Sequence, residues 1–411
     1  MLFGAPSHRI ESQLNATATV LEVDAQFIHF PGIVIASFGD FDSHTSETHF
    51  VKSKTDLALG SLHRVHHVYK KVVHDEMGVE EGAEELTTIL HAKPVWSVSS
   101  RVLFSFIKCF IMAPLSFGGS IVDACIAGVF GGFLTFLQLH VAGKNQMYSN
   151  VFEISMAIII SFVSRGLSST GVFCYQAIAS SGVILVLPGY VVLCGSLELA
   201  SKNMIAGSVR MVYAIIYSLF LGFGIAIGSD VYFLLDPGAR KTMHVPLQTS
   251  SQQPLTPWLN FLFVPVFATL ACFNLLQPLR SREVPVAVFI ACVGWVINRV
   301  TKTFIFDRSD VVSAIGSFAI GLLGNLYSRI FKGTAFTAMT PAVLFLVPSG
   351  MAMAGGLAMT YKGSDGDLYS NGLSIGLRMI QVSIGITTGL FASCLVVYAF
   401  GRKKGAALFA F

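Results

Sequence analysis

Two combinations of proline with glycine interrupt otherwise apolar stretches of this sequence. Pro188-Gly189 lies in the run VLPG, and Pro348-Ser349-Gly350 lies in LVPSG. Proline removes one backbone hydrogen-bond donor and clashes with the preceding turn, so a helix can open there. In a membrane segment the opened backbone groups can contact a polar solute, or the proline can simply bend the helix. Both positions are therefore candidate binding sites, with an ordinary kink as the alternative.

Two carboxylates lie near the starts of apolar stretches, where an ionised group is costly to bury. Asp123 follows Gly118-Gly119, and Glu153 lies in the first turn of the next apolar stretch. Either could bind and release a proton. The alternative is a carboxylate at a helix N-terminus, where the helix dipole stabilises it.

Other polar side chains in these stretches are amides and arginines. The amides could contact a polar substrate or hydrogen-bond a neighbouring helix, which is the commoner use. They are Asn274, Asn298, Asn325 and Gln381. The arginines lie near the ends of the stretches, where long side chains usually extend to the lipid headgroups. They are Arg165, Arg210, Arg329 and Arg378.

Histidines cluster between His63 and His74. His63 and His67, four residues apart, could chelate a metal if they lie on a helix, but neither an HExxH pattern nor a nearby cysteine accompanies them. A solvated helix face is the alternative, and we expect no metal site. No GxSxG, Walker A or GxGxxG sequence occurs in a context that supports an enzyme, so no cofactor is expected.

Charge is distributed unevenly along the chain. Residues 1–97 hold 13 acidic and 7 basic residues, whereas residues 98–411 hold 10 acidic and 20 basic residues among long apolar runs. This pattern indicates a domain outside the bilayer followed by a membrane part. Basic clusters with interleaved aromatic residues are absent from the sequence, so nucleic-acid binding is not expected.

The elements that must position these residues are ten apolar segments, since about 17–20 residues suffice to cross a bilayer. We predict spans near 101–118, 121–140, 151–167, 173–196, 206–229, 259–277, 284–299, 311–329, 335–358 and 373–399. The fold class is thus an α-helical polytopic membrane protein. The membrane domains predicted are a first five-helix repeat, residues 98–232, and a second five-helix repeat, residues 258–411, joined by an extracytoplasmic connecting loop, 233–257.

The two sets of five segments resemble each other. Ser164-Arg165 and Ser328-Arg329 end corresponding segments, and the two proline–glycine positions also correspond. Because each set has an odd number of segments, the second set must enter the membrane from the opposite side. We therefore expect an inverted five-plus-five repeat, an arrangement frequent in secondary transporters.

Residues 1–97 are predicted to form a small α+β domain that folds alone. Helical spacing follows Pro6, a β-rich stretch extends from Phe27 to Gly39, and helices follow Asp56 and Gly78. The absence of a signal sequence from residues 1–20 and the basic residues at 402–404 favour cytoplasmic N- and C-termini.

Several motifs resemble the threonine/serine exporter family, and most of all its fungal branch, the proteins like pheromone-regulated membrane protein ten. They are GAPSHRIE (residues 4–11), QFIHFPGIVIASFGD (26–40), GVEEGAEEL (78–86), FGGSIVDACIAG (117–128) and VLPG (186–189). The resemblance covers essentially the whole chain. It implies a cytoplasmic domain, about ten spans, and efflux of small hydroxy amino acids driven by the proton gradient.

The leading hypothesis is a secondary transporter that exports a small polar amino acid, with proton coupling as an option. Its partners are the lipid bilayer of the plasma or vacuolar membrane, the amino acid and protons. The alternatives are a membrane-embedded hydrolase and a non-transporting membrane regulator that uses the N-terminal domain. The sequence leaves the oligomeric state open.

Overall fold

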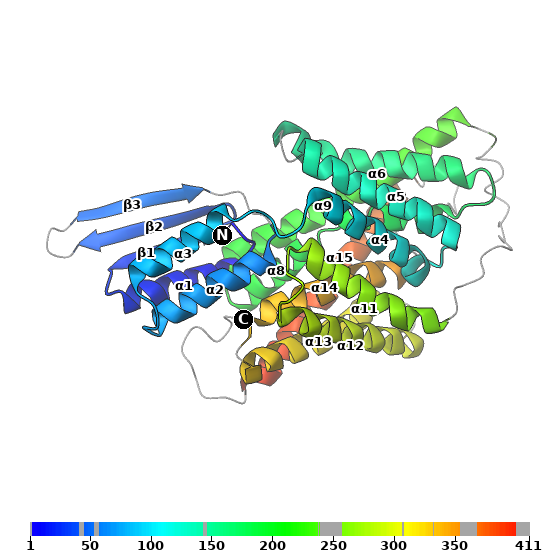
Figure 1. Cartoon of the computed structure of the whole chain (residues 1–411). Helices are drawn as coiled ribbons and strands as arrows, with labels where there is room; N and C mark the ends of the chain where they lie inside the picture. The colour runs from blue at the N-terminus through cyan, green and yellow to red at the C-terminus, as the bar shows by residue number, and fades with distance from the viewer. Residues whose placement is uncertain are drawn as a thin grey trace.

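The computed structural model describes residues 2–40, 45–52, 57–142, 146–236, 238, 257–305, 308–331, 333–353 and 368–399. Within them Figure 1 shows a small domain with a β-sheet beside a larger bundle of helices. Most of the predicted connecting loop, 233–257, lies outside the described residues, and so do the basic residues at 402–404.

The N-terminal domain combines three helices with a three-stranded antiparallel sheet of order β1-β2-β3. Helix α1 (Ser7–Val20) is followed by β1 (Ala25–Phe30), β2 (Ile33–Asp40), β3 (Thr45–Lys52), α2 (Leu59–Val73) and α3 (Val79–His91). The turn between β1 and β2 is Pro31-Gly32, and Gly32 has φ +90°, which glycine adopts without steric cost. The predicted order of helix, strands and two helices is therefore the order observed.

The core of this domain continues into the helical bundle. Val34 of β2 and Leu59 of α2 belong to one buried cluster with Leu275 and Phe336 of the bundle. Among the described residues, a small second cluster between α2 and α3 is formed by the domain itself. The expectation that residues 1–97 fold alone stays a prediction, and the shared core gives a physical reason why the isolated domain would expose apolar surface.

The bundle consists of helices that coincide with the predicted apolar segments. They are α4 (Val98–Phe117), α5 (Ile121–Leu137) with a π-helical extension (Gln138–Ala142), α6 (Gln146–Ser168), α7 (Tyr175–Gly182), α8 (Gly189–Ala200), α9 (Met204–Leu235), α11 (Pro257–Asn274), α12 (Glu283–Phe304), α13 (Ser309–Phe331), α14 (Ala335–Met353) and α15 (Leu368–Ala399).

Seven helices of the described part are long and apolar enough to cross a membrane, and the number becomes eight if the bent pair α7–α8 is one span. The apolar helices Trp258–Asn274 and Ala335–Val347 are shorter. A predominantly helical membrane protein with a small N-terminal sheet is thus confirmed. Ten crossings remain a prediction, because the fourth segment is bent and two segments are short.

Corresponding helices of the two halves pack in corresponding pairs. α4 packs on α5 as α11 packs on α12, and α6 packs on α9 as α13 packs on α15. Glycine permits the close approach within the second kind of pair. A Cβ at Gly228 of α9 would overlap the carbonyl oxygen of Ile158, and a Cβ at Gly389 of α15 would overlap that of Ala314. Contacts between α9 and α15 join the two halves.

Candidate functional site

The helix break expected near Pro188 is present. α7 ends at Gly182, a 3-10 turn (Ile184–Val186) follows, and α8 starts at Gly189 with its axis 52° from that of the preceding segment. The start of α8 lies against α14, because a Cβ at Gly189 would be 3.2 Å from Cγ2 of Val347. The break therefore lies where the two halves meet, although the nearest groups on α14 are apolar.

The second proline–glycine position differs from this one. The backbone of α14 stays helical from Ala335 to Met353, so it passes through Pro348-Ser349-Gly350 without a break. The expected opening of the helix is therefore not observed here. A bend that neighbouring helices support is compatible with proline inside a membrane helix. The side chains of Pro348 and Ser349 lie outside the described part of the structure.

A buried carboxylate, Glu198, joins α8 to both α9 and the N-terminal domain. Its side chain is 0% exposed; one oxygen lies 3.1 Å from Nε of Arg210, and the other accepts a 2.7 Å hydrogen bond from the backbone N–H of Ser7. Ser7 is the first residue of α1, so the positive end of that helix points at the carboxylate. Tyr190, just after the helix break, donates a hydrogen bond to the carbonyl of Gly4.

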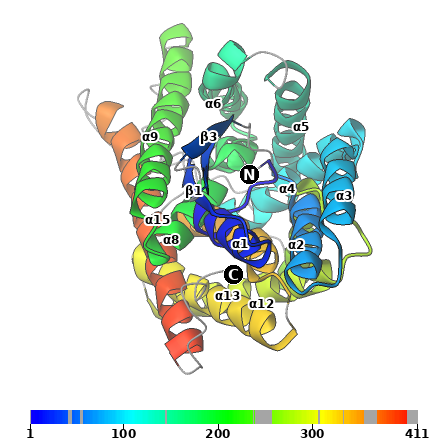
Figure 2. The same ribbon diagram turned by 90° about the vertical axis from the view of Figure 1, so that its left-hand side faces the viewer.

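Helix α1 begins against the end of the bundle that faces the N-terminal domain. Figure 2, which looks onto the N-terminal domain, shows α1 in front of the middle of the bundle, with α8 on one side and α12 and α13 below. Arg9, two residues after Ser7, is also buried, and it interacts electrostatically with Glu283 of α12. Burial lowers the pKa of Arg9 to about 10, while the charge of Glu283 opposes that shift. The first turn of α1 therefore hydrogen-bonds a buried acid of the first half and interacts electrostatically with a buried acid of the second half.

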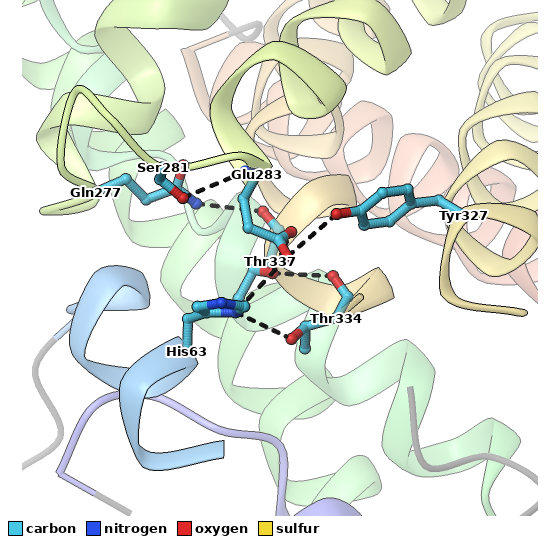
Figure 3. Close-up of polar contacts among 7 residues, drawn as sticks. All are labelled: His63, Gln277, Ser281, Glu283, Tyr327, Thr334 and Thr337. Carbon is cyan, nitrogen blue, oxygen red and sulfur yellow. Dashed lines mark hydrogen bonds and ion pairs between the residues drawn. The ribbon is translucent and has the colours of Figure 1, made fainter. Parts of the chain in front are cut away.

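Glu283 is the centre of the second polar cluster (Figure 3), and its side chain is 4% exposed overall. Its Oε2 accepts a 3.1 Å hydrogen bond from the hydroxyl of Thr337, and its Oε1 accepts one of 3.3 Å from the hydroxyl of Tyr327. Nδ1 of His63, on α2, lies 3.6 Å from Oε1 and 3.3 Å from the hydroxyl of Thr334. The carboxylate therefore contacts α13, α14 and the N-terminal domain.

Gln277 and Ser281 complete the cluster from the loop between α11 and α12. The Gln277 amide donates to the carbonyl of Thr337 at 3.4 Å, and Ser281 accepts from the backbone N–H of Glu283 at 3.2 Å. Oε1 of Gln277 is buried with no hydrogen-bond partner among the described residues. A cavity of about 480 Å³ lies beside the cluster, between α2, the linker before α4 and this loop.

The chemistry available here is proton exchange and the binding of a cation. A carboxylate near an imidazole can take up a proton whose charge the two groups share. The charge of Glu283 acts on Arg9 against the effect of burial, and Nδ1 of His63 lies 3.6 Å from the Glu283 carboxylate. The cluster therefore places a buried acid where the N-terminal domain meets the bundle.

Asp123 occupies a helix N-terminus, as the alternative interpretation had it. It forms a capping box with Ser120, and its Oδ1 accepts a 3.0 Å hydrogen bond from the backbone N–H of Cys174 at the start of α7. The same relation recurs in the other half, where Glu283 at the start of α12 bonds Thr337 near the start of α14. A proton-coupling role for Asp123 is not tested by this geometry.

The remaining predicted site residues lie at different helix contacts. Glu153 lies two turns inside α6, beside Tyr217 of α9, and not in the first turn as expected. Asn325 donates to Ser393 across the α13–α15 contact at 3.5 Å. Asn298 is buried on α12, and Gln381 accepts a 3.3 Å bond from Ser309. These contacts are of the helix-to-helix kind, and no single site within the described residues gathers them.

The expected position of two arginines at the headgroups is wrong. Arg165 is buried, with Nε 2.8 Å from the hydroxyl of Ser229 and its guanidinium 3.3 Å from the centre of the Tyr175 ring. Arg210 is paired with Glu198. The solvated face expected for the histidines is also only partly correct. His67 is exposed, but His63 contacts the bundle and His66 hydrogen-bonds Gln13 at 3.0 Å.

Sequence reasoning missed both buried acids. Glu198 is a lone charge within VVLCGSLELA, and that isolation in an apolar run is the signal that could have marked it. Glu283 follows Ser281-Arg282 at a segment end, where a solvated loop residue is the ordinary interpretation.

The fold and these clusters define a polytopic helical membrane protein with a sheet-containing domain docked on buried acids. Comparison with known proteins then gives the family. The sequence model of the threonine/serine exporter matches residues 1–232, and a second model, also described as threonine/serine exporter, matches residues 261–396. The chain belongs to the threonine/serine exporter family.

Relatives in fungi extend this match over the whole chain. An uncharacterised protein of Schizosaccharomyces pombe is 43% identical over 100% of this chain and 55% of its own length. Pheromone-regulated membrane protein 10 of Candida glabrata is 43% identical over 98% of this chain and 52% of its own length, and that of Saccharomyces cerevisiae is 41% identical over 98% and 53%. The chain spans about half the length of these curated relatives. No solved structure matches it.

Proposed function

We propose that this protein is a secondary transporter that exports small polar amino acids of the threonine or serine type. The observation that carries the proposal is the break at Pro188-Gly189, which lies at the contact of α8 with α14. Backbone groups at a broken membrane helix can replace the hydration of a polar solute. The family to which the chain belongs supports the substrate class.

The two halves are proposed to form an inverted repeat of five spans each. Ten spans result if the bent pair and the two shorter apolar helices each cross the membrane. The corresponding helix pairs and the corresponding arginines support this arrangement. Arg165 of α6 bonds Ser229 of α9, and Arg329 of α13 bonds the carbonyl of Val397 of α15. With this repeat, the substrate path would lie between the halves.

Glu283 is the proton-coupling group that this proposal favours. It hydrogen-bonds Thr337 on α14, and the same helix contacts Gly189 at Val347, about three turns further along. A change of charge at Glu283 could therefore shift α14 against the helix break. Asp123 and Glu153 stay candidates in the first half, while Asn298, Asn325 and Gln381 are more readily explained as helix contacts.

The N-terminal domain is proposed to close the cytoplasmic end of the path. Its helix α1 hydrogen-bonds Glu198 of the first half through Ser7, and Arg9 interacts electrostatically with Glu283 of the second half. Movement between the halves would have to change both interactions. Cytoplasmic N- and C-termini and a place in the plasma or vacuolar membrane follow from the sequence expectations.

Flux through the purified full-length protein tests this function. Liposomes loaded with radiolabelled threonine or serine should release the amino acid faster with the protein than without it. A difference between the rates of release with and without a pH gradient across the membrane would show proton coupling. Leucine is the matched apolar control and should not be released. Release no faster than from protein-free liposomes would favour a non-transporting membrane protein instead.

A further inference from the structure

The rim of the cavity beside Glu283 is strongly basic. Four cationic side chains line it from three separate segments: Arg64 of α2, Lys93 of the linker before α4, and Arg280 and Arg282 of the loop before α12. Glu283 is the one acidic residue among the lining residues. A concave site with four cations and one anion attracts an anionic ligand.

These four cations are available for a ligand. In the described part of the chain, none of the ion pairs includes them, and Arg64 donates a 3.2 Å hydrogen bond to the hydroxyl of Ser61. Glu283 does not neutralise them, since its oxygens are directed at Thr337, Tyr327 and His63. Phosphate oxygens are the acceptors that arginine and lysine bind most effectively.

The surroundings of the cavity combine apolar and polar contacts as residues at a membrane surface do. Trp96, in the linker, packs its ring 5.1 Å from Phe104 and 5.0 Å from Phe273, and its indole N–H donates to the carbonyl of Gln277 at 3.0 Å. Tryptophan with an apolar contact on one side and a polar contact on the other is typical of the headgroup level. Val95 and Leu279, which are 48% and 65% exposed, lie in the linker and in the loop before α12, two of the three segments that carry the cations.

We propose that this cavity binds the phosphate of an anionic phospholipid from the leaflet next to the N-terminal domain. Arg64, Lys93, Arg280 and Arg282 would hold the headgroup, and the acyl chains would lie along the exposed apolar residues beyond Leu279. The bound lipid connects α2 to the loop before α12, so it stabilises docking of the N-terminal domain beside Glu283. This site is independent of whether the protein transports amino acids.

Lipid binding to the full-length protein in neutral detergent micelles tests this site. The probes are a fluorescent phosphatidylinositol phosphate, phosphatidylcholine with the same label, and the soluble inositol phosphate headgroup. The variant Lys93→Gln/Arg280→Gln/Arg282→Gln removes three exposed cations of the rim. The matched control, Lys52→Gln/Arg299→Gln/Arg308→Gln, removes the same charge from exposed positions outside the cavity.

We expect the wild-type protein to bind the anionic lipid selectively and the rim variant to bind it with about 100-fold lower affinity. Each cation near an anionic membrane surface contributes about 1 kcal/mol, and 1.4 kcal/mol is tenfold in affinity. The control variant should bind within about twofold of wild type, within roughly 0.4 kcal/mol. Equal binding by the rim variant and wild type would overturn the proposal. So would equal affinity for the soluble headgroup and the lipid, which would identify a free phosphate compound as the ligand.

Discussion

Gly60 of α2 offers a direct test of how the N-terminal domain docks. A Cβ at this position would overlap the carbonyl oxygen of Leu276 and would lie 3.0 Å from Cδ of Pro278, where ordinary contact is 3.4–4 Å. The neighbouring residue Leu59 donates its backbone N–H to the carbonyl of Leu275 at 2.9 Å. In the substitution Gly60→Ala, α2 must therefore move away from the loop between α11 and α12.

The cost of this movement can be worked out from its parts. Overpacking costs about 1–3 kcal/mol, and loss of the Leu59 hydrogen bond costs about 1 kcal/mol. Alanine favours a helix over glycine by about 1 kcal/mol, which offsets part of this cost. The net weakening of docking is about 2–3 kcal/mol when the overpacking is in the upper half of its range. Exchange of amide hydrogens in residues 57–66 should accelerate roughly 30- to 140-fold.

Hydrogen exchange of the full-length protein, read by mass spectrometry on peptides from α2 and from residues 275–282, measures this effect. Gly78→Ala is the matched control, because a Cβ at Gly78 has no atom within 4 Å and its φ is −66°. The control should leave exchange of α2 unchanged. If Gly60→Ala also exchanged at the wild-type rate, the docked arrangement of α2 would be refuted.

Three further predictions concern separate parts of the structure. Glu198→Gln leaves Arg210 without its charged partner, and thermal unfolding in detergent should show a free energy of unfolding lower by about 2–3 kcal/mol. This is below the value for a fully buried pair because the side chain of Arg210 is 15% exposed. An unchanged unfolding midpoint would contradict the pairing. Pro188→Ala should reduce threonine flux by about tenfold, which is the effect of one lost hydrogen bond to the solute. Pro114→Ala in α4 is the control and should leave the flux unchanged. Equal flux in the two variants would show that Pro188 has a structural role only. Burial, and to a lesser extent the charge of Arg210, lowers the pKa of His29 to about 4. The neutral imidazole therefore contributes stability above about pH 6.5, and this contribution is lost as the pH falls toward 4. Between pH 7 and 4.5 the free energy of unfolding should fall by about 1–2 kcal/mol more in wild type than in His29→Leu, and parallel profiles would refute this.

Local patterns in the sequence predicted the elements of this fold. The apolar segments fall on helices because composition alone decides which residues can face lipid. The β-rich stretch predicted from Phe27 to Gly39 contains two strands, and the turn between them is Pro31-Gly32, where glycine allows the positive φ. The break at Pro188 followed from the missing backbone donor. In α14, by contrast, the same residues did not break the helix, because neighbouring helices help decide between a bend and a break.

The polar clusters could not be predicted because they join residues far apart in the chain. Ser7 and Glu198 are 191 residues apart, and each is unremarkable in its own segment. Arg165 lies near a helix end, where a headgroup position is the usual outcome, yet the hydroxyl of Ser229 and the ring of Tyr175 hold it inside. One sequence contains no information about such pairs beyond the rule that a lone charge in an apolar run needs a partner.

Radiotracer flux through Glu283→Gln tests the central claim most directly. Glutamine keeps the size of the side chain and one accepting oxygen but cannot ionise, so threonine release from liposomes should lose its acceleration by a pH gradient while the protein stays folded. Glu84→Gln, an exposed substitution on α3 with the same change of charge, should keep the wild-type acceleration. If a pH gradient accelerated threonine release equally in the wild type and in Glu283→Gln, the account would be contradicted.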